Sequence, residues 1–337
     1  DGGFLQVRSC DDISVMTNEA LKEIDLALKG NKSIAVLSRT NFAYSPVLIH
    51  YILKHGGKFT VFGDSYDLDK AKYKRVWQLV HLLEGRGLEA LKMNLRLIDP
   101  SLKPWDVSSF ERVMKNEVSG NDSVLSYLYE FACETRSRPL GVFVKKLDGW
   151  IESGIVDELE LFKLMLEYLI TEVTPSIAEP MVTILSLVKL SKNLEDFYQN
   201  KGFINNVLKD KNKNEVNGSV IFSTPHGFKG KQAHYVVVFN ASEGVFPTYL
   251  STKETFPEER RNFFIVGTRA KERQVYLTMR GNESPFIEEL GVSVEHIEGS
   301  DVKLDFNIRQ ENLKARLTDK EPVEIDFENV DFGEFFN

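Results

Sequence analysis

Residues 223–247 (STPHGFKGKQAHYVVVFNASEGVFP) and 258–270 (EERRNFFIVGTRA) decide the fold of this chain. The first stretch begins where a short apolar strand ends, passes through a polar loop with Lys229 and Gly230, and continues into a second strand, YVVVF. A cation and a glycine in such a loop are typical of an edge that contacts phosphate. The second stretch predicts a short helix that begins with paired acids and ends at Arg269, ahead of another strand. Together they indicate an α/β domain.

The same alternation extends upstream of these stretches. A helix is predicted at residues 12–29 and another from Ser45 and Pro46 to Gly56. Strands alternating with helices imply a parallel sheet with helices on both faces. The strands are expected at residues 4–9, 33–37, 58–62, 219–223, 235–239 and 273–278.

A helical block interrupts this alternation. From about Trp77 to Asn200 the apolar residues recur at helical spacing, and the polar linker KDKNKNEVNG at residues 209–218 marks the return of strands. We therefore predict one discontinuous α/β domain (residues 1–76 and 215–300), a helical insertion (77–214) and a C-terminal tail (301–337).

These sequences resemble motifs of the UvrD/Rep-like superfamily 1 DNA helicases. Residues 223–247 are similar to motif V, residues 258–270 to motif VI and residues 34–41 (IAVLSRTN) to motif IVa. The strand KFTVFGDSY and the segment ESPFIEEL at residues 283–290, which is similar to a helix that follows motif VI, extend the likeness. The sequence KGKQA followed by HYVVV is more similar to the helicase IV branch than to UvrD itself. The resemblance implies the second RecA-like motor domain (2A) with an inserted 2B-like domain.

Such helicases bind ATP between two motor domains and move single-stranded DNA across both, in the 3′ to 5′ direction. By resemblance, Arg269 reaches the γ-phosphate from across the cleft as an arginine finger, a role that suits its planar and permanent charge. The alternative is a helix-terminal arginine stabilised by the helix dipole. Gly230 and Gln232 are further ATP-binding candidates. Gln232 falls where the family has a glutamate that contacts the nucleotide sugar, and an amide can still hydrogen-bond a hydroxyl.

The resemblance also implies a track for single-stranded DNA. Thr224, His226 and Lys229 match family positions that contact the DNA backbone or link it to the ATP cleft. Neutral donors with one cation suit a strand that is held and then released. Motif IVa adds the DNA-binding candidates Arg39, Thr40 and Asn41. The alternative for these three residues is a turn at a strand end, with Asn41 capping the next helix.

Acids at the start of a helix are expected on dipole grounds alone, so we assign Glu258 and Glu259 no catalytic part. No stretch matches G-x-x-x-x-G-K-[ST], and Asp157 and Glu158 are expected to open a helix rather than hold magnesium. ATP and Mg²⁺ are therefore expected to be bound mainly by an N-terminal motor domain that is absent from this sequence, and no metal ligand is assigned. Because the chain opens at Asp1, we expect it to be part of a longer polypeptide, inactive as an ATPase alone.

The charge and the cysteine content bear on which partners and which location are expected for this protein. The net charge is -8, but residues 319–337 hold seven acids against one lysine, so the rest of the chain is nearly neutral and leaves room for a local cationic track. The two cysteines, Cys10 and Cys133, favour a reducing compartment, and no apolar run predicts a membrane span, so a cytoplasmic location is expected.

The acidic, phenylalanine-containing tail is expected to be a solvated segment, with a protein-docking peptide as the alternative. The expected partners are single-stranded DNA, junctions of single and double strands, ATP, and a protein bound through residues 319–337. The rival function is a non-catalytic interaction module derived from a helicase, docking a polymerase or a repair factor.

Overall fold

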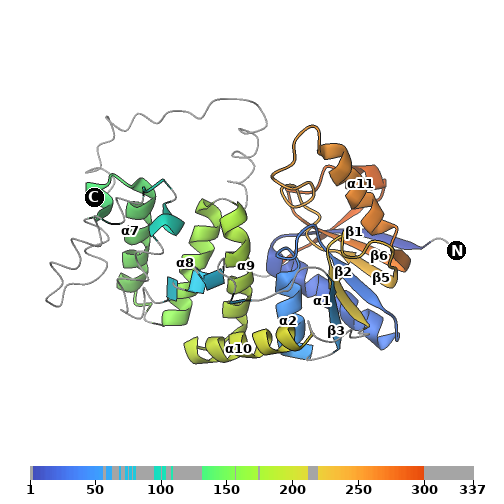
Figure 1. Cartoon of the computed structure of the whole chain (residues 1–337), viewed down its shortest axis with the longest axis horizontal. Coiled ribbons are helices and arrows are strands. Elements are labelled where there is room, and N and C mark those ends of the chain that lie inside the picture. Colours follow the sequence, from blue (N-terminus) through green and yellow to red (C-terminus); the bar gives the residue numbers. More distant parts are fainter. Residues whose placement is uncertain are drawn as a thin grey trace. The chain divides into compact units, whose positions relative to one another are not determined.

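The computed structural model contains one sheet, built from strands that precede and strands that follow the helical block in the sequence (Figure 1). The structure describes residues 3–55, 58–62, 68–69, 73–74, 76–77, 79–80, 95–99, 101–103, 108, 131–155, 157–173, 175–211 and 219–299. The described strands form a seven-stranded sheet in the order β3-β4-β2-β5-β6-β1-β7. Their bounds are β1 Phe4–Cys10, β2 Ile34–Leu37, β3 Phe59–Phe62, β4 Val220–Ser223, β5 Ala233–Val238, β6 Ala270–Met279 and β7 Val294–Ile297.

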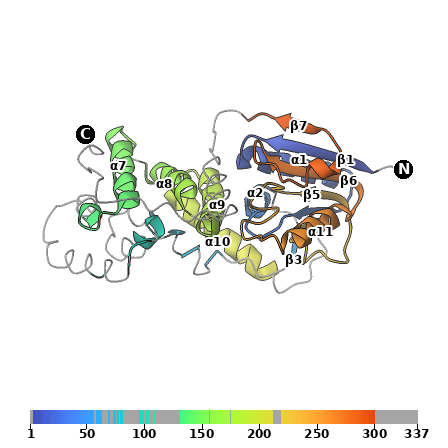
Figure 2. The same cartoon turned by 90° about the horizontal axis from the view of Figure 1, so that it is seen from above.

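All pairings between these strands are parallel, so each connection must cross over a face of the sheet. The helices α1 (Ile13–Lys29) and α2 (Ser45–His55) cover one face, and α11 (Phe256–Gly267) covers the other (Figures 1 and 2). Right-handed crossovers explain this placement, because the connections after β1 and β2 step across the sheet in one direction and those after β4 and β5 step in the opposite direction. The predicted α/β fold with a parallel sheet is therefore confirmed, and it is consistent with a RecA-like domain.

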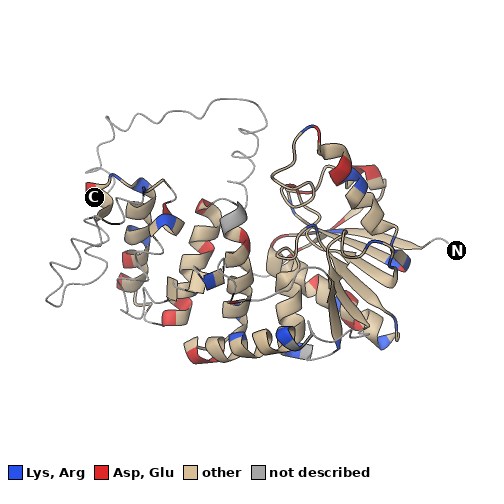
Figure 3. Ribbon diagram, viewed as in Figure 1, with Lys and Arg blue, Asp and Glu red and all other residues tan. Residues whose placement is uncertain are grey.

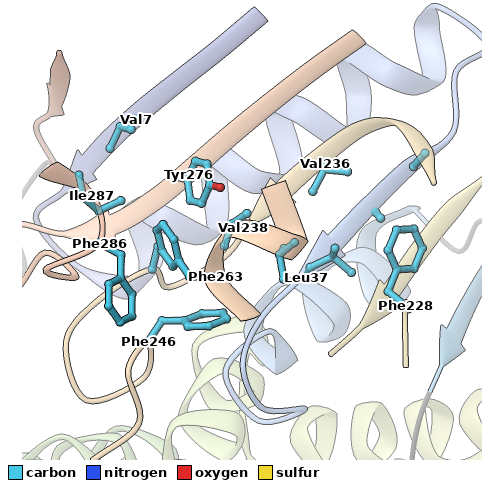
Figure 4. Close-up of a cluster of buried hydrophobic side chains, with 14 residues drawn as sticks. Val7, Leu37, Phe228, Val236, Val238, Phe246, Phe263, Tyr276, Phe286 and Ile287 are labelled. Atoms are coloured by element: carbon cyan, nitrogen blue, oxygen red, sulfur yellow. The ribbon is translucent and has the colours of Figure 1, made fainter. Parts of the chain in front are cut away.

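Aromatic side chains fill the layer between α11 and the sheet (Figure 4). Phe263 of α11 stacks on Tyr276 of β6 with ring centroids 4.9 Å apart, and it packs against Phe246 and Phe286 at 5.4 Å. All four rings are fully or almost fully buried. Burial of one such side chain contributes about 2–3 kcal/mol. These contacts hold α11 firmly on β6, which fixes the residues at both ends of the helix.

The described elements between β3 and β4 are all helices, as predicted for the insertion. They are α7 (Arg138–Glu152), α8 (Glu158–Glu172), α9 (Pro175–Leu190) and α10 (Leu194–Lys211). Helix α9 packs on α8 and also on α2, where the hydroxyl oxygens of Ser45 and Thr183 lie 2.6 Å apart. Asp157 caps α8 by accepting a hydrogen bond from the backbone N–H of Glu160, which agrees with the helix start expected there. Much of the predicted helical sequence between residues 78 and 130 lies outside the described residues.

Two details at the end of the sheet differ from the expectations. The helix implied over residues 283–290 is wrong, because the structure has only a 3₁₀ turn, η1 (Glu288–Leu290). Pro285 interrupts that segment, and the next two residues turn into the core, where Phe286 and Ile287 are buried. The edge strand β7, which pairs with β1, was not predicted. The described residues all belong to one compact unit, and the tail from residue 300 onward lies outside them, so its predicted roles stay predictions.

Candidate functional site

The parallel sheet places the candidate residues along two opposite edges. Because all strands run the same way, their carboxyl ends share one edge and their amino ends share the other. Thr224 directly follows β4, and Arg39 follows β2 after a single serine, so the DNA-binding candidates begin at the carboxyl edge. Gln232 directly precedes β5, and Arg269 directly precedes β6, at the amino edge. A four-residue strand such as β2 separates the two edges by about 13 Å.

The loop from β4 to β5 connects these edges over the face that α11 also covers. Thr224 starts it: its hydroxyl oxygen accepts the N–H of Gly227 at 3.3 Å, and its carbonyl accepts the N–H of Phe228 at 3.0 Å. Phe228 anchors the loop in the core (Figure 4), and Gly227 passes so close to β4 that a Cβ there would lie 2.7 Å from a serine hydroxyl. The side chains of His226 and Lys229 are exposed. The loop is therefore fixed by its apolar residue, while its polar residues face solvent.

The end of this loop delivers Gln232 to the amino edge. Gly230 has φ +78°, a left-handed conformation that strains any other residue, and it turns the chain toward β5. Lys231 then lies with its ammonium 4.5 Å from the centre of the Phe62 ring. Gln232 itself is exposed. Its amide is therefore open to a ligand at the amino edge.

Arg39 is held by an acid from α11. Its Nε and one terminal nitrogen bind both carboxylate oxygens of Glu259 at 2.7–3.0 Å. This hydrogen bonding raises the pKa of Arg39, against the opposing effect of burial. Glu259 is only 5% exposed, so the pair is far less screened than a surface ion pair. The acid was assigned to the helix dipole alone, yet its side chain lies on the buried face of α11.

The neighbours of Arg39 stabilise the turn before α2. The hydroxyl oxygen of Thr40 accepts the backbone N–H of Ala43 at 3.3 Å, and the side-chain oxygen of Asn41 accepts the hydroxyl of Tyr44 at 2.9 Å. Asn41 thus binds the side chain of Tyr44, and Thr40 stabilises the turn at Ala43, before α2 begins. Both residues remain partly exposed at the carboxyl edge.

Arg269 differs from the other partly buried arginines in the described part of the chain. Arg8 and Arg273 both bind the carboxylate of Glu23, at 2.9 and 2.7 Å, and Arg39 is paired with an acid as well. Arg269 has no ion pair with any described residue, and its buried Nε has no hydrogen-bond partner there. A buried donor without a partner is costly, so such groups in native proteins call for an explanation.

The backbone around Arg269 is tightly fixed. Its carbonyl accepts the N–H of Ala233, the residue after Gln232, at 3.1 Å, which joins the two ATP-binding candidates across neighbouring strands. Gly267 lies so close to the side chains of Gln274 and Tyr276 that a Cβ could not be placed there without moving them. Arg269 and Gln232 are therefore brought together at the amino edge by backbone contacts.

Sequence reasoning missed two further polar groups at the carboxyl edge. The hydroxyl of Ser38, after β2, and the side-chain oxygen of Asn240, after β5, are buried without a hydrogen-bond partner among the described residues. Asn240 also has φ +58°, an uncommon conformation for a residue other than glycine. Glu259 could have been found, because its spacing of four and seven from Phe263 and Val266 places all three on one buried helix face.

Part of the chain, between residues 157 and 280, is similar to a known family. Residues 157–280 match the family model described as the UvrD-like helicase C-terminal domain. This region includes α8–α10, β4, β5, α11 and β6, and it contains the β4–β5 loop and Arg269. A search of curated proteins found no match. The match supports the resemblance to a UvrD-like helicase C-terminal domain.

The described residues contain neither a helix that could cross a membrane nor a group of metal ligands. None of the described helices is both long and apolar enough to cross a membrane. Among the same residues, no three or more His, Cys, Asp or Glu side chains are grouped as metal ligands would be. Charged residues lie mainly on helices and loops, and the strands are mostly uncharged (Figure 3).

Proposed function

We propose that this chain is the second motor region of an ATP-dependent, UvrD-like DNA helicase or translocase, closest to the helicase IV branch, and that Arg269 is its arginine finger. The observation that carries the proposal is that Arg269, at the amino edge, has no acid partner among the described residues, whereas each of the other partly buried arginines in that part of the chain is paired with an acid. A guanidinium that lacks an internal acid keeps its donors for an external anion, and the planar fork suits phosphate oxygens. The residues present therefore fit a nucleotide phosphate that approaches this edge.

Gln232 and Gly230 complete the nucleotide side of the proposal. Gln232 would hydrogen-bond the ribose with its exposed amide, and Gly230 would allow the turn that brings it there. The phosphate cradle and the Mg²⁺ ligands would belong to a first motor domain, so we propose that this chain does not hydrolyse ATP alone. When bound between the two domains, ATP would supply the phosphoryl group whose developing charge Arg269 stabilises.

At the opposite edge we propose the track for single-stranded DNA. The exposed His226 and Lys229, with Thr224, Thr40 and Asn41, would contact the backbone. These are mostly neutral donors, which hold a strand without the steep salt dependence of many ion pairs. Arg39 belongs to the same edge, and its pairing with Glu259 is considered below.

The test is DNA-stimulated ATP hydrolysis by the complete motor, with the first motor domain present. Arg269→Ala should lower the turnover rate by about 10³-fold, because an arginine finger acts mainly in the transition state. Affinity for single-stranded DNA should stay within about twofold, because Arg269 is on the other edge of the sheet. Arg261→Ala, on the exposed side of α11, is the matched control and should retain activity. Turnover at the wild-type rate in Arg269→Ala would refute the assignment.

A further inference from the structure

We infer that Arg39 and Glu259 form a positioning pair that couples the carboxyl edge of the sheet to Arg269, and that Arg39 is not itself a phosphate contact. The inference rests on the proposed function and assigns these two residues a role in it. It concerns how the two edges of one domain are connected, which is the property that a motor needs.

The pair lies between two segments with different candidate partners. Arg39 follows β2 and is next to Thr40 and Asn41, the DNA-binding candidates of that strand end. Glu259 belongs to the first turn of α11. Their side chains form a bidentate ion pair with three nitrogen–oxygen distances of 2.7–3.0 Å, which fixes the orientation of both groups as well as their separation. A shift of the β2 end should therefore be passed to the start of α11.

Helix α11 is built to carry such a shift to its other end. Its 12 residues span about 18 Å at 1.5 Å per residue. Phe263 in its middle is buried in the aromatic cluster (Figure 4). Gly267 at its end lies close against the side chain of Tyr276. Arg269 follows two residues later. Because packed cores are stiff, the helix and its two ends are expected to move as one body.

The electrostatics argue against Arg39 as a phosphate ligand. Two of its donors are already occupied by a carboxylate that is almost fully buried. The pair is neutral overall, so it adds little attraction for a polyanion. Lys229, with an exposed ammonium, is the better cation at this edge. Two roles for Arg39 can thus be separated by experiment, because a phosphate contact and a positioning pair respond differently when Glu259 loses its charge.

The first measurement is affinity for a fluorescent single-stranded oligonucleotide over a range of salt concentrations, with the complete motor. If the pair is a positioning unit, Arg39→Met and Glu259→Gln leave the slope of log affinity against log salt unchanged. If Arg39 contacts phosphate, Arg39→Met lowers the slope by about 0.7, the loss of one contact to a single strand, and Glu259→Gln tightens binding by freeing a cation. That second result overturns the inference.

The second measurement is DNA-stimulated ATP turnover by the same variants. We expect Arg39→Met and Glu259→Gln each to lower the turnover rate by about tenfold, and the double variant to be no worse than either single one. Arg39→Lys should recover only part of the turnover rate that Arg39→Met loses, because an ammonium cannot bind both carboxylate oxygens. The control is Arg260→Met, which removes the exposed Arg260–Glu289 pair of the same helix and should change turnover less than twofold.

These measurements separate the inference from the proposed function. If Arg269→Ala abolishes turnover but Arg39→Met and Glu259→Gln retain it within twofold while their melting temperatures fall, the pair is only structural and the inference fails alone. If the wild-type motor shows no DNA-stimulated hydrolysis, the proposed function fails and the inference fails with it. A tenfold loss in both variants, with the salt slope preserved, supports the coupling.

Discussion

At the carboxyl edge of the sheet, the guanidinium of Arg39 binds both carboxylate oxygens of Glu259. At the amino edge, by contrast, a buried nitrogen of the Arg269 guanidinium has no partner among the described residues. Both arginines are partly buried and both are next to a strand. Among the described residues, the fold pairs Arg39 with an acid and leaves Arg269 without one, and we propose that an outside anion binds Arg269. This difference is tested by measuring what each of the two types of arginine contributes to the free energy of unfolding.

The largest expected effect on stability comes from the acid that two arginines share. Glu23→Gln should lower the free energy of unfolding by about 3 kcal/mol, because it removes the acid that binds Arg273 and one of the two buried acids that bind Arg8, the other being Glu19. Arg269→Met keeps the apolar stem, removes a donor that has no partner, and should change it by less than about 0.5 kcal/mol. Urea denaturation of the chain followed by circular dichroism gives both values. A loss of more than 2 kcal/mol in Arg269→Met would show that Arg269 is structural.

A smaller effect depends on pH and extends the comparison to a third partly buried basic side chain, His50. Burial, helped by the nearby charge of Lys54, lowers the pKa of His50 to about 4, against the opposing hydrogen bond to the carbonyl of Pro46. Since the unfolded histidine titrates near pH 6.5, the stability that depends on neutral His50 is complete above that pH and is lost as the pH falls from about 6.5 to 4. The loss is on the order of 2–3 kcal/mol.

The measurement is the melting temperature of wild type and His50→Leu between pH 4 and pH 7. The variant should show a shallower decline across this interval. If both proteins declined equally, His50 would not be the group that causes the loss, and the assignment would be wrong.

The sequence predicted the sheet because its signals are local. Apolar runs such as those at Ile34–Leu37 and Val220–Ser223, separated by helical periodicity, are sufficient to indicate a parallel α/β fold. The edge strand β7 lacks such a run: the sequence Val-Glu-His-Ile alternates, and its strand conformation depends on pairing with β1, almost 300 residues away. Edge strands of this kind are defined by their neighbour more than by their own residues.

The positions of the candidate residues in the fold could be predicted from the sequence, but their pairing could not. A residue directly after or before a strand is placed at an edge by topology alone, which was enough for Thr224, Gln232 and Arg269. The binding of Arg39 by Glu259 joins residues 220 positions apart and depends on how α11 is seated over the sheet. Long-range ion pairs of this type arise from tertiary packing, and local patterns indicate only that Glu259 is on a buried helix face.

The most direct test of the role proposed for Arg269 uses ADP with aluminium fluoride, which mimics the transferring phosphoryl group, bound to the complete motor with single-stranded DNA. Because an arginine finger acts on the transition state, Arg269→Ala should bind ADP alone as tightly as wild type but lose most of the additional affinity given by aluminium fluoride, by about 10³-fold. Equal stabilisation of the complex in the variant and in wild type would contradict the account, because Arg269 would then have no contact with the transferring group.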